Sequence, residues 1–335
     1  MQRSLRLSLS LTGAAALALA GYPIQPVVAQ EDGSAADLGV MEINLKDAVQ
    51  FNWGFQGALQ GAGTPNQAGI GAFLPIAVGE NSVFFIDALA NANFADRSNY
   101  SSIVDTTVTG TTISTSTRLG YRWLNGDRSW MYGINAGYDS RPMNTAYADS
   151  GISVEDGSAF YQQVAFNLEA VSNQWSLNAY GLIPVGETTQ ELNWNYNGGA
   201  LQAYGLDAGY MINPNLKVSL GSYYQKGDYN KCKGEDEVDN VGLRGRLSYK
   251  IANGLVAGIN ASYDDSYDTR VSADVKYRFG WNGYGAPSRE RKTPAIEALS
   301  ATPANRDVKV HDVFFGRNGY GECWCGGLIC KRAKV

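Results

Sequence analysis

The chain has 335 residues, a formal net charge of −5 and 44% hydrophobic residues. Beyond the N-terminal region no run of about 18 apolar residues occurs, so the sequence predicts no membrane-spanning helix, and the mild acidity argues against a general nucleic-acid-binding protein. Glycine (39 residues) and tyrosine (20 residues) are abundant while proline (10 residues) is scarce, which favours a large antiparallel β-structure with aromatic girdles.

The N-terminus has the features of a secretory signal. Arg3 and Arg6 form a short positive region, residues 7–20 are apolar and rich in small side chains, and "VVA" at 27–29 provides a small-residue cleavage site. We therefore predict cleavage after Ala29 and export from the cytoplasm. The following stretch "MEINLKDAVQ" at 41–50 favours a short amphipathic helix over a strand.

From about residue 50 to residue 279, segments of roughly ten residues alternate between apolar and polar side chains, which indicates β-strands with two different faces. Twelve strands are predicted, at about 50–61, 69–77, 83–95, 111–124, 130–140, 158–171, 174–184, 200–212, 215–226, 238–251, 254–265 and 269–279. Short turns with Gly, Asn or Ser alternate with longer polar loops along this region.

The last predicted strand, "TRVSADVKYRFG" at 269–280, shows the choice between two fold classes. Its apolar positions are 271, 273, 275, 277 and 279, and its polar positions carry Asp274, Lys276 and Arg278. Such a strand fits the core of a soluble sandwich or a barrel with apolar residues toward lipid and charges in the lumen. Across the chain, the apolar-face aromatics lie near strand ends, and the other face is too polar for a second core. This favours an all-β, 12-stranded antiparallel transmembrane barrel of the outer membrane.

The order and spacing of several motifs resemble one barrel family. The stretches "LGYRWLNGDRSWMYGINAGYDSRP" at 119–142, "AYGLIPVGE" at 179–187, "YGLDAGYMINPNLKVSLGSYYQKGD" at 204–228 and "VGLRGRLSYKIANGLVAGINASYDDSYDTRVSADVKYRFG" at 241–280 are similar to hairpins of the inverse-autotransporter barrel, the intimin and invasin class. The resemblance implies a twelve-stranded outer-membrane barrel with a periplasmic N-terminus. It also implies that the chain after the last strand returns through the lumen and carries a passenger to the cell surface.

The chain is expected to divide into four segments: a signal peptide at 1–29, a short periplasmic segment at 30–49, the barrel at 50–280, and a C-terminal linker and tail at 281–335. An extended chain advances at most about 3.5 Å per residue, so crossing the lumen takes roughly 15 residues of the last segment. The rest is shorter than the roughly 100 residues of an immunoglobulin-like adhesin domain. The sequence therefore predicts a short exported tail or a remnant passenger.

The candidate functional residues are lumen-facing charges and interface aromatics. The predicted lumen-facing residues are Arg118, Arg122, Glu169, Asp207, Arg244, Arg246, Lys250, Asp274, Lys276 and Arg278. Tyr277 and Phe279 are expected at the periplasmic interface, where the barrel closes. In the linker after the last strand, Arg289, Arg291 and Lys292 are candidates for ion pairs with Glu169, Asp207 and Asp274. Alternatively, they belong to a solvated basic linker.

No catalytic, metal-binding or cofactor-binding set is predicted. Barrel phospholipases and proteases use a histidine as general base, and the one histidine, His311, follows the last predicted strand. The sequence therefore predicts that the protein is not an enzyme. Cys323, Cys325 and Cys330 lack a standard zinc spacing even with His311, so a disulfide or an unstructured segment is favoured. Acidic residues near 235–239 and 264–268 fit a solvated loop better than a Ca²⁺ site.

These observations predict an outer-membrane barrel of the inverse-autotransporter type that anchors or translocates its C-terminal segment to the cell surface. The alternatives are a porin-like channel for small polar solutes and a barrel that recognises surface ligands through its loops. The expected partners are outer-membrane lipid, the barrel-assembly machinery and a surface ligand of the outer loops or the tail, but no nucleic acid.

Overall fold

The computed structural model describes residues 43–59, 61–96, 101–148, 157–193, 196–228, 237–280, 293–314, 323–325 and 328–330. The predicted signal peptide with its cleavage site at Ala29 lies outside these ranges. The linker residues Arg289, Arg291 and Lys292 also lie outside them. No helix in the described ranges is both long and apolar enough to cross a membrane.

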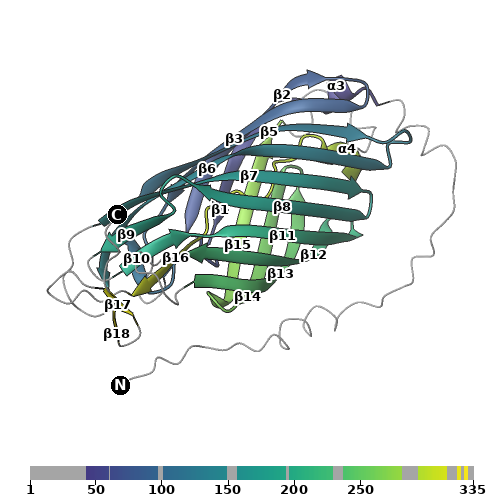
Figure 1. Cartoon of the computed structure of the whole chain (residues 1–335). Coiled ribbons are helices and arrows are strands. Elements are labelled where there is room, and N and C mark those ends of the chain that lie inside the picture. Colours follow the sequence, from purple (N-terminus) through teal and green to yellow (C-terminus); the bar gives the residue numbers. More distant parts are fainter. Residues whose placement is uncertain are drawn as a thin grey trace.

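Twelve long strands, each antiparallel to its neighbours, close into a barrel within the described ranges (Figure 1). They are β1 (Asn52–Ala58), β2 (Gln67–Val78), β3 (Ser82–Asn93), β5 (Thr112–Leu124), β6 (Trp130–Ala148), β7 (Gly157–Ser172), β8 (Trp175–Val185), β11 (Gln202–Asn213), β12 (Leu216–Asp228), β13 (Glu237–Ala252), β14 (Leu255–Asp264) and β15 (Asp268–Phe279). The barrel closes where β1 pairs with β15, from Trp53 opposite Phe279 to Ala58 opposite Asp274. This confirms the predicted fold class, and every strand overlaps its predicted range.

Short helices and strands also form outside the twelve barrel strands, in the loops, before the barrel and after it. Strand β4 (Thr106–Thr109) pairs with the far part of β6, and β9 (Thr189–Asn193) forms a hairpin with β10 (Tyr196–Ala200). Helix α3 (Leu45–Ala48) confirms the expected helix before the barrel. The C-terminal segment forms helix α4 (Pro294–Ala298), strand β16 (Val310–Phe314) and the backbone hairpin β17 (Cys323–Cys325) and β18 (Leu328–Cys330).

The two ends of the barrel differ in their connections. The short turns at 79–81, 125–129, 173–174, 214–215 and 253–254 all lie at one end, which we call the short-turn end. Gly254 has φ +78°, a backbone conformation that favours glycine. The opposite end, called the long-loop end, carries β4, β9 and β10. Outer-membrane barrels place short turns on the periplasmic side and long loops outside.

The outer surface of the barrel is an apolar belt with aromatic residues at its short-turn edge. Leu206 and Leu220, at mid-strand, are 67% and 70% exposed. At the short-turn end, Trp53 stacks on Phe279 with ring centroids 4.7 Å apart, and Tyr277 meets Phe279 edge to face at 4.5 Å. A closed barrel with this surface belongs in a lipid bilayer, because lipid covers the apolar side chains and aromatic rings sit at headgroup depth.

The inner face carries the predicted charges, but the expectation that it is too polar for a packed core is wrong at the short-turn end. There Phe73, Val83, Phe85, Leu124 and Met131 point inward and form a buried apolar cluster. The cluster also contains α3 and α4 residues, which supply its centre. These strands are apolar on both faces near this end, so the alternation weakens and hides the core.

Aromatic rings inside the barrel lie across glycines of the next strand. A Cβ on Gly205 would come within 2.5 Å of the Tyr180 ring, and a Cβ on Gly242 would lie 2.3 Å from the ring of Tyr223. Only glycine permits this close approach, and the ring covers the backbone that the missing side chain exposes. Part of the glycine and tyrosine content is therefore explained by the lumen.

A charge placed on the apolar belt should destabilise the membrane-inserted barrel. Leu206→Arg puts a cation at mid-strand on the lipid face, where it costs about 2–4 kcal/mol. Glu80→Arg, at an exposed turn, is the matched control and should cost about 1 kcal/mol or less. Denaturant titration of the barrel in lipid vesicles measures both values, and equal losses for the two variants would contradict the lipid-facing assignment.

Candidate functional site

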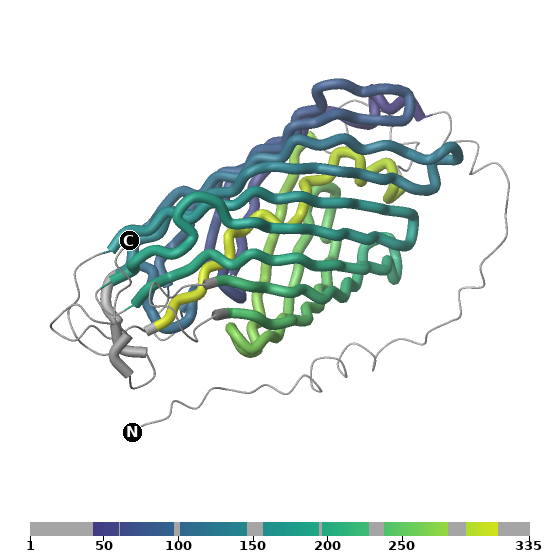
Figure 2. Tube along the Cα trace, viewed as in Figure 1, coloured from purple at the N-terminus to yellow at the C-terminus, as the bar shows by residue number. Residues whose placement is uncertain are grey.

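The C-terminal residues 293–314, called the tail here, run through the lumen from the short-turn end to the long-loop end (Figure 2). Helix α4 lies at the first end, and β16 pairs with β10 at the second. Between them the chain has no regular secondary structure at 301–309. Its backbone polar groups must therefore bond to the barrel wall or to water.

At the short-turn end, α4 completes the apolar cluster. Thr293 caps the helix by accepting a hydrogen bond from the Ile296 amide, and Pro294 occupies the first turn, where its missing N–H costs nothing. Ile296 and Leu299 are 1% and 0% exposed among the inward-facing residues Phe85 and Met131. The side chain of Glu297 reaches Lys250 on β13 at 3.3 Å.

Above the helix, Arg122 on β5 binds the extended backbone of the tail. Its guanidinium donates to the carbonyls of Leu299 at 3.2 Å and Ala301 at 2.6 Å, while its other nitrogens form a bidentate pair with Glu169 at 2.8 and 3.1 Å. The guanidinium also lies 4.5 Å from the centroid of the Phe85 ring. Glu169 compensates the buried charge, and the arginine satisfies two tail carbonyls.

At mid-lumen, Asn305 contacts opposite sides of the wall. Its carbonyl accepts from Arg118 at 3.1 Å, its Oδ1 accepts from Arg244 at 2.9 Å, and its Nδ2 donates to Asn178 at 2.9 Å. Asn305 has φ +54°. Asparagine tolerates this left-handed conformation better than most residues, so both its backbone and its side chain suit this position.

The next residue, Arg306, forms the most deeply buried ion pair between tail and wall. Its guanidinium pairs with Asp87 on β3, and the two side chains are 6% and 0% exposed. The same group donates to the Ser116 hydroxyl at 2.7 Å and to the Ser116 carbonyl at 3.0 Å. The pair is almost fully enclosed, so removing either partner leaves a buried, unpaired charge.

Toward the long-loop end, the wall binds three successive tail residues. Gln67 donates to the Asp307 carboxylate at 3.1 Å, and Arg141 donates to the Val308 carbonyl at 2.9 Å. The Lys309 ammonium lies 4.0 Å from the centroid of the Tyr223 ring. These contacts hold the tail in one register along the lumen.

Strand β16 attaches the tail to the loops at the mouth. Val310 pairs with Ala200 and Phe314 with Tyr196 on β10. The Asp312 carboxylate accepts from the amides of Asp105 at 3.0 Å and Thr106 at 2.6 Å, and from the Thr106 hydroxyl. Burial raises the pKa of Asp312, although these hydrogen bonds oppose the rise. One tail carboxylate thus connects β16 to the loop before β4.

All ten predicted lumen charges do lie on the inner face of the barrel wall. Arg118 pairs with Asp139 at 2.6 Å, Arg244 with Asp207, and Arg246 with Asp274 at 2.7 Å. Arg122, Glu169 and Lys250 contact each other or the tail as described, Arg278 is buried, and Lys276 lines an internal cavity. Their role in function remains a prediction.

The carboxylates of Glu169, Asp207 and Asp274 are paired with arginines of the barrel itself. In each pair one strand lies between the arginine and the carboxylate, so the pair forms within the wall and without the tail. The basic linker residues that the sequence offers as further partners, Arg289, Arg291 and Lys292, lie outside the described residues.

Sequence reasoning missed the residues that bind the tail most firmly. Asp87 is the one charge in the strand "SVFFIDALANAN", and it shares inward parity with Phe85 and Asn91. A single acidic residue on the inner face of an apolar strand indicates a buried cationic partner, and Asp87 was such a signal in the sequence. Arg306 and Asp312 lie in a segment without alternation, where nothing in the sequence indicates their partners.

His311 lies at the mouth of the barrel, not away from it as the sequence suggests. It pairs with Gly199 through β16, its Nε2 lies 3.2 Å from the Ser266 carbonyl, and its ring lies 5.5 Å from that of Tyr267. The tail returns through the lumen, which brings this residue back to the wall. Nowhere in the described ranges do three or more His, Cys, Asp or Glu side chains gather as a metal site.

The closed barrel, its apolar belt and its charged lumen define the class: the chain is an outer-membrane β-barrel protein. Among solved structures, a membrane protein from a study of in-meso crystallization matches with a TM-score of 0.53 and 12% identity, over 79% of this chain and 100% of that chain. The translocator domain of the autotransporter NalP from Neisseria meningitidis matches at 0.39 and 13%, over 73% and 91%. No family model and no curated protein sequence matches.

Outer membrane phospholipase A from Escherichia coli is also among the similar structures, with a TM-score of 0.34 and 13% identity over 72% of this chain and 97% of that chain. The sequence-based prediction excluded enzymes, and that exclusion is wrong because an enzyme is among the barrels of similar shape. This likeness concerns the fold and establishes no activity for this chain.

Removing the tail's buried cation should destabilise the docked tail strongly. Arg306→Met leaves Asp87 charged and unpaired, at a cost of about 3–5 kcal/mol in the free energy of unfolding. The Arg306→Met, Asp87→Asn double variant should recover part of that loss. Lys250→Met removes the more accessible tail pair with Glu297 and should cost about 1 kcal/mol or less. Denaturant titration compares the four proteins, and equal losses in Arg306→Met and Lys250→Met would refute the assignment.

Docking of β16 should weaken in acid through His311. Burial lowers the pKa of His311, opposed by the Ser266 carbonyl and the carboxylates of Asp105 and Asp264. The undocked histidine, with a pKa of about 6.5, therefore binds a proton more readily than the docked one. The stabilisation of docked β16 by neutral His311 is fully present above about pH 6.5 and is lost as the pH falls below 6.5.

Hydrogen-exchange protection factors of residues 308–312 measure this effect. Between pH 6.5 and 5.5 they should fall by no more than about tenfold, and His311→Gln should remove the fall. The raised pKa of Asp312 has the opposite sign, since a docked acid that holds its proton favours docking as the pH falls. A fall that persists in His311→Gln would assign it to another group.

Proposed function

We propose that the barrel holds its own C-terminal segment across the outer membrane and displays it at the cell surface, in the manner of an inverse autotransporter. The observation that carries the proposal is the tail itself, which crosses the whole lumen and pairs with a loop hairpin at the far mouth. The direction of crossing, from the short-turn end to the long-loop end, is that of export.

The nature of the contacts supports a transport route for a chain. Arg122, Arg118 and Arg141 bind tail carbonyls, which every residue provides, so these contacts accept an extended backbone whatever its side chains. The sequence-specific contacts, at Asn305, Arg306 and Asp312, then fix one resting position. A lumen that combines both kinds of contact suits the passage and subsequent retention of its own chain.

The alternative of an open porin-like channel has less support. The tail occupies the lumen axis along the length of the barrel, and the short-turn end is packed with apolar side chains from α3, α4 and the wall. A water-filled channel needs a continuous polar path from one end of the barrel to the other. The expected partners, the barrel-assembly machinery and a surface ligand of the tail or loops, belong to the same proposal.

The location of the C-terminus in intact cells tests the proposal. An epitope after Val335 should be cleaved by added protease and bound by antibody without opening the outer membrane. The matched control is the same epitope inserted at Gly126, in a short turn where an added Cβ would meet no neighbouring atom within 4 Å. That epitope should become accessible only after the outer membrane is permeabilised.

The opposite result would reject the proposal. If the Val335 epitope is reached only after permeabilisation while the barrel resists heat denaturation on a gel, the chain is inserted but its end is not displayed. If the Gly126 epitope is reached in intact cells, the orientation of the barrel is inverted and the tail runs inward.

A further inference from the structure

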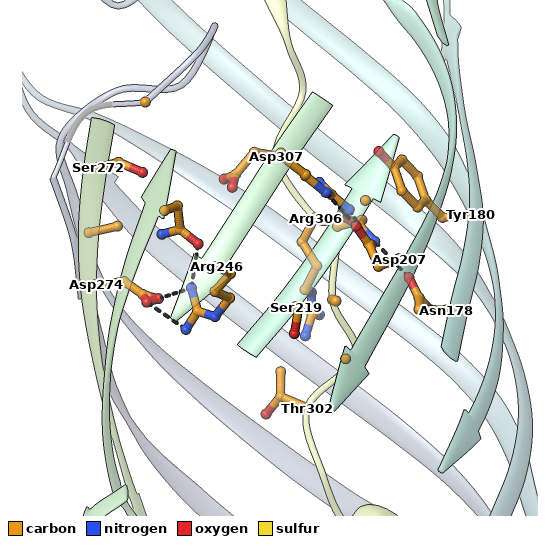
Figure 3. Close-up of a pocket in the computed structure, with 18 of the residues that line it drawn as sticks. Asn178, Tyr180, Asp207, Ser219, Arg246, Ser272, Asp274, Thr302, Arg306 and Asp307 are labelled. Atoms are coloured by element: carbon orange, nitrogen blue, oxygen red, sulfur yellow. Dashed lines mark hydrogen bonds and ion pairs between the residues drawn. The ribbon is translucent and has the colours of Figure 1, made fainter. Parts of the chain in front are cut away.

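The tail does not fill the lumen evenly, and a cavity of about 520 Å³ remains beside it (Figure 3). Residues of the tail line it together with strands β8, β11–β15 and β1 and with single residues of β2, β5 and β6 and two of β7. In Figure 3, Arg246 and Asp274 are joined on one wall, and Asp207 and Arg306 lie across the space from them. Charged and polar side chains line the cavity together with apolar ones such as Met131 and Leu182.

The charges that line the cavity do not balance. The four arginines in its lining are each ion-paired with a carboxylate named above. Three lysines remain, Lys217, Lys276 and Lys309, against one remaining carboxylate, that of Asp307. Three positive charges less one negative charge leave an excess of two.

Two of these lysines have no hydrogen bond or close ion pair among the described residues. They are Lys217 on β12 and Lys276 on β15, whereas Lys309 lies over the Tyr223 ring. Arg246 repels both, and the carboxylates that attract them, Asp207 for Lys217 and Asp274 for Lys276, are already paired with arginines. Cations enclosed in this way are costly unless an anion or well-ordered water compensates them.

The chemistry of the lining matches a phosphate group. Inorganic phosphate and a phosphate monoester carry about two negative charges near neutral pH, equal to the excess, and their oxygens accept strong charge-assisted hydrogen bonds from ammonium groups. Ser219, Ser272 and Asn260 also line the cavity and supply neutral donors beside the cations. A chloride ion would supply one negative charge and leave those donors with a single acceptor atom.

A second cavity, of about 500 Å³, lies at the seam where β1 ends. Leu59, just beyond Ala58, still donates from its amide to the Ala273 carbonyl at 2.7 Å, and residues 268–272 of β15 then pair only with β14. Leu59 and Phe94, which line this cavity, are among the exposed apolar residues of the barrel, and both cavities share Ala58 and Asp274 in their lining. The seam therefore offers a lipid headgroup a short route to the lysines.

We propose that the lumen cavity binds a phosphate group through Lys217 and Lys276, either as free phosphate or as the phosphate-monoester headgroup of a lipid at the seam between β1 and β15. The proposal rests on the wall and on the docked tail, and it goes beyond the display of the C-terminus. The phosphate would balance the charge of the two lysines, because the arginines of the lining are already paired with carboxylates.

Binding of inorganic phosphate to the purified full-length protein tests the free form. Isothermal titration at constant ionic strength, adjusted with sodium chloride, should show saturable binding. Lys217→Met with Lys276→Met should weaken that binding at least tenfold, and the Lys→Arg double variant should retain it. Lys46→Met, at an exposed residue of α3, is the matched control and should bind as the wild type does. Resistance of each variant to heat denaturation on a gel shows that it is folded.

Native mass spectrometry of the protein extracted from membranes tests the lipid form. A phosphate-bearing lipid retained by the wild type and lost from the Lys→Met double variant identifies the headgroup as the source. Saturable phosphate binding without retained lipid identifies free phosphate. Absence of both, or equal binding by the wild type and the folded double variant, overturns the proposal. None of these outcomes depends on whether the Val335 epitope reaches the surface.

Discussion

Lipid offers no hydrogen bonds, so every backbone N–H and C=O in the membrane must find a partner within the protein. The ladder from β1 to β15 meets this constraint by closing on itself at Trp53 and Phe279. A closed ring of twelve strands encloses more space than its own inward side chains fill, since about eight strands suffice for a filled interior. The remaining space holds water in porins and a plug in other barrels, and in this chain the tail occupies it.

An extended tail brings its own unpaired backbone into the lumen, and the wall compensates it with arginines. Arg118 and Arg122 each bind a carboxylate of the wall and a carbonyl of the tail. The carboxylate holds the arginine in place and balances its charge, and the arginine donates to a tail carbonyl. Buried ion pairs contribute little net stability, because desolvation offsets their attraction. Their effect here is to fix one register, in which Arg306 meets Asp87.

The strands were predictable from the sequence because alternation is a local signal with a period of two residues. The last strand shows this most clearly, since its inward Asp274, Lys276 and Arg278 contrast with outward Val and Tyr residues. The tail was not predictable beyond its presence. Asp87 and Arg306 are 219 residues apart, and no period connects them. The core around Phe85 was hidden for a different reason, because an apolar residue on either face of a strand looks the same in the sequence.

Under the proposed export, the docked tail corresponds to the end of passage and not to a step within it. Moving the tail by one residue would separate Arg306 from Asp87 and Asp312 from Thr106 at once, and would leave buried charges on both sides. It would also pull Leu299 out of the apolar cluster. The carbonyl contacts alone would survive such a shift, because each residue presents an equivalent group. In the proposed export, a chain in transit would contact the arginines of the wall through its carbonyls, and the side-chain contacts at 305–312 would then hold it in place.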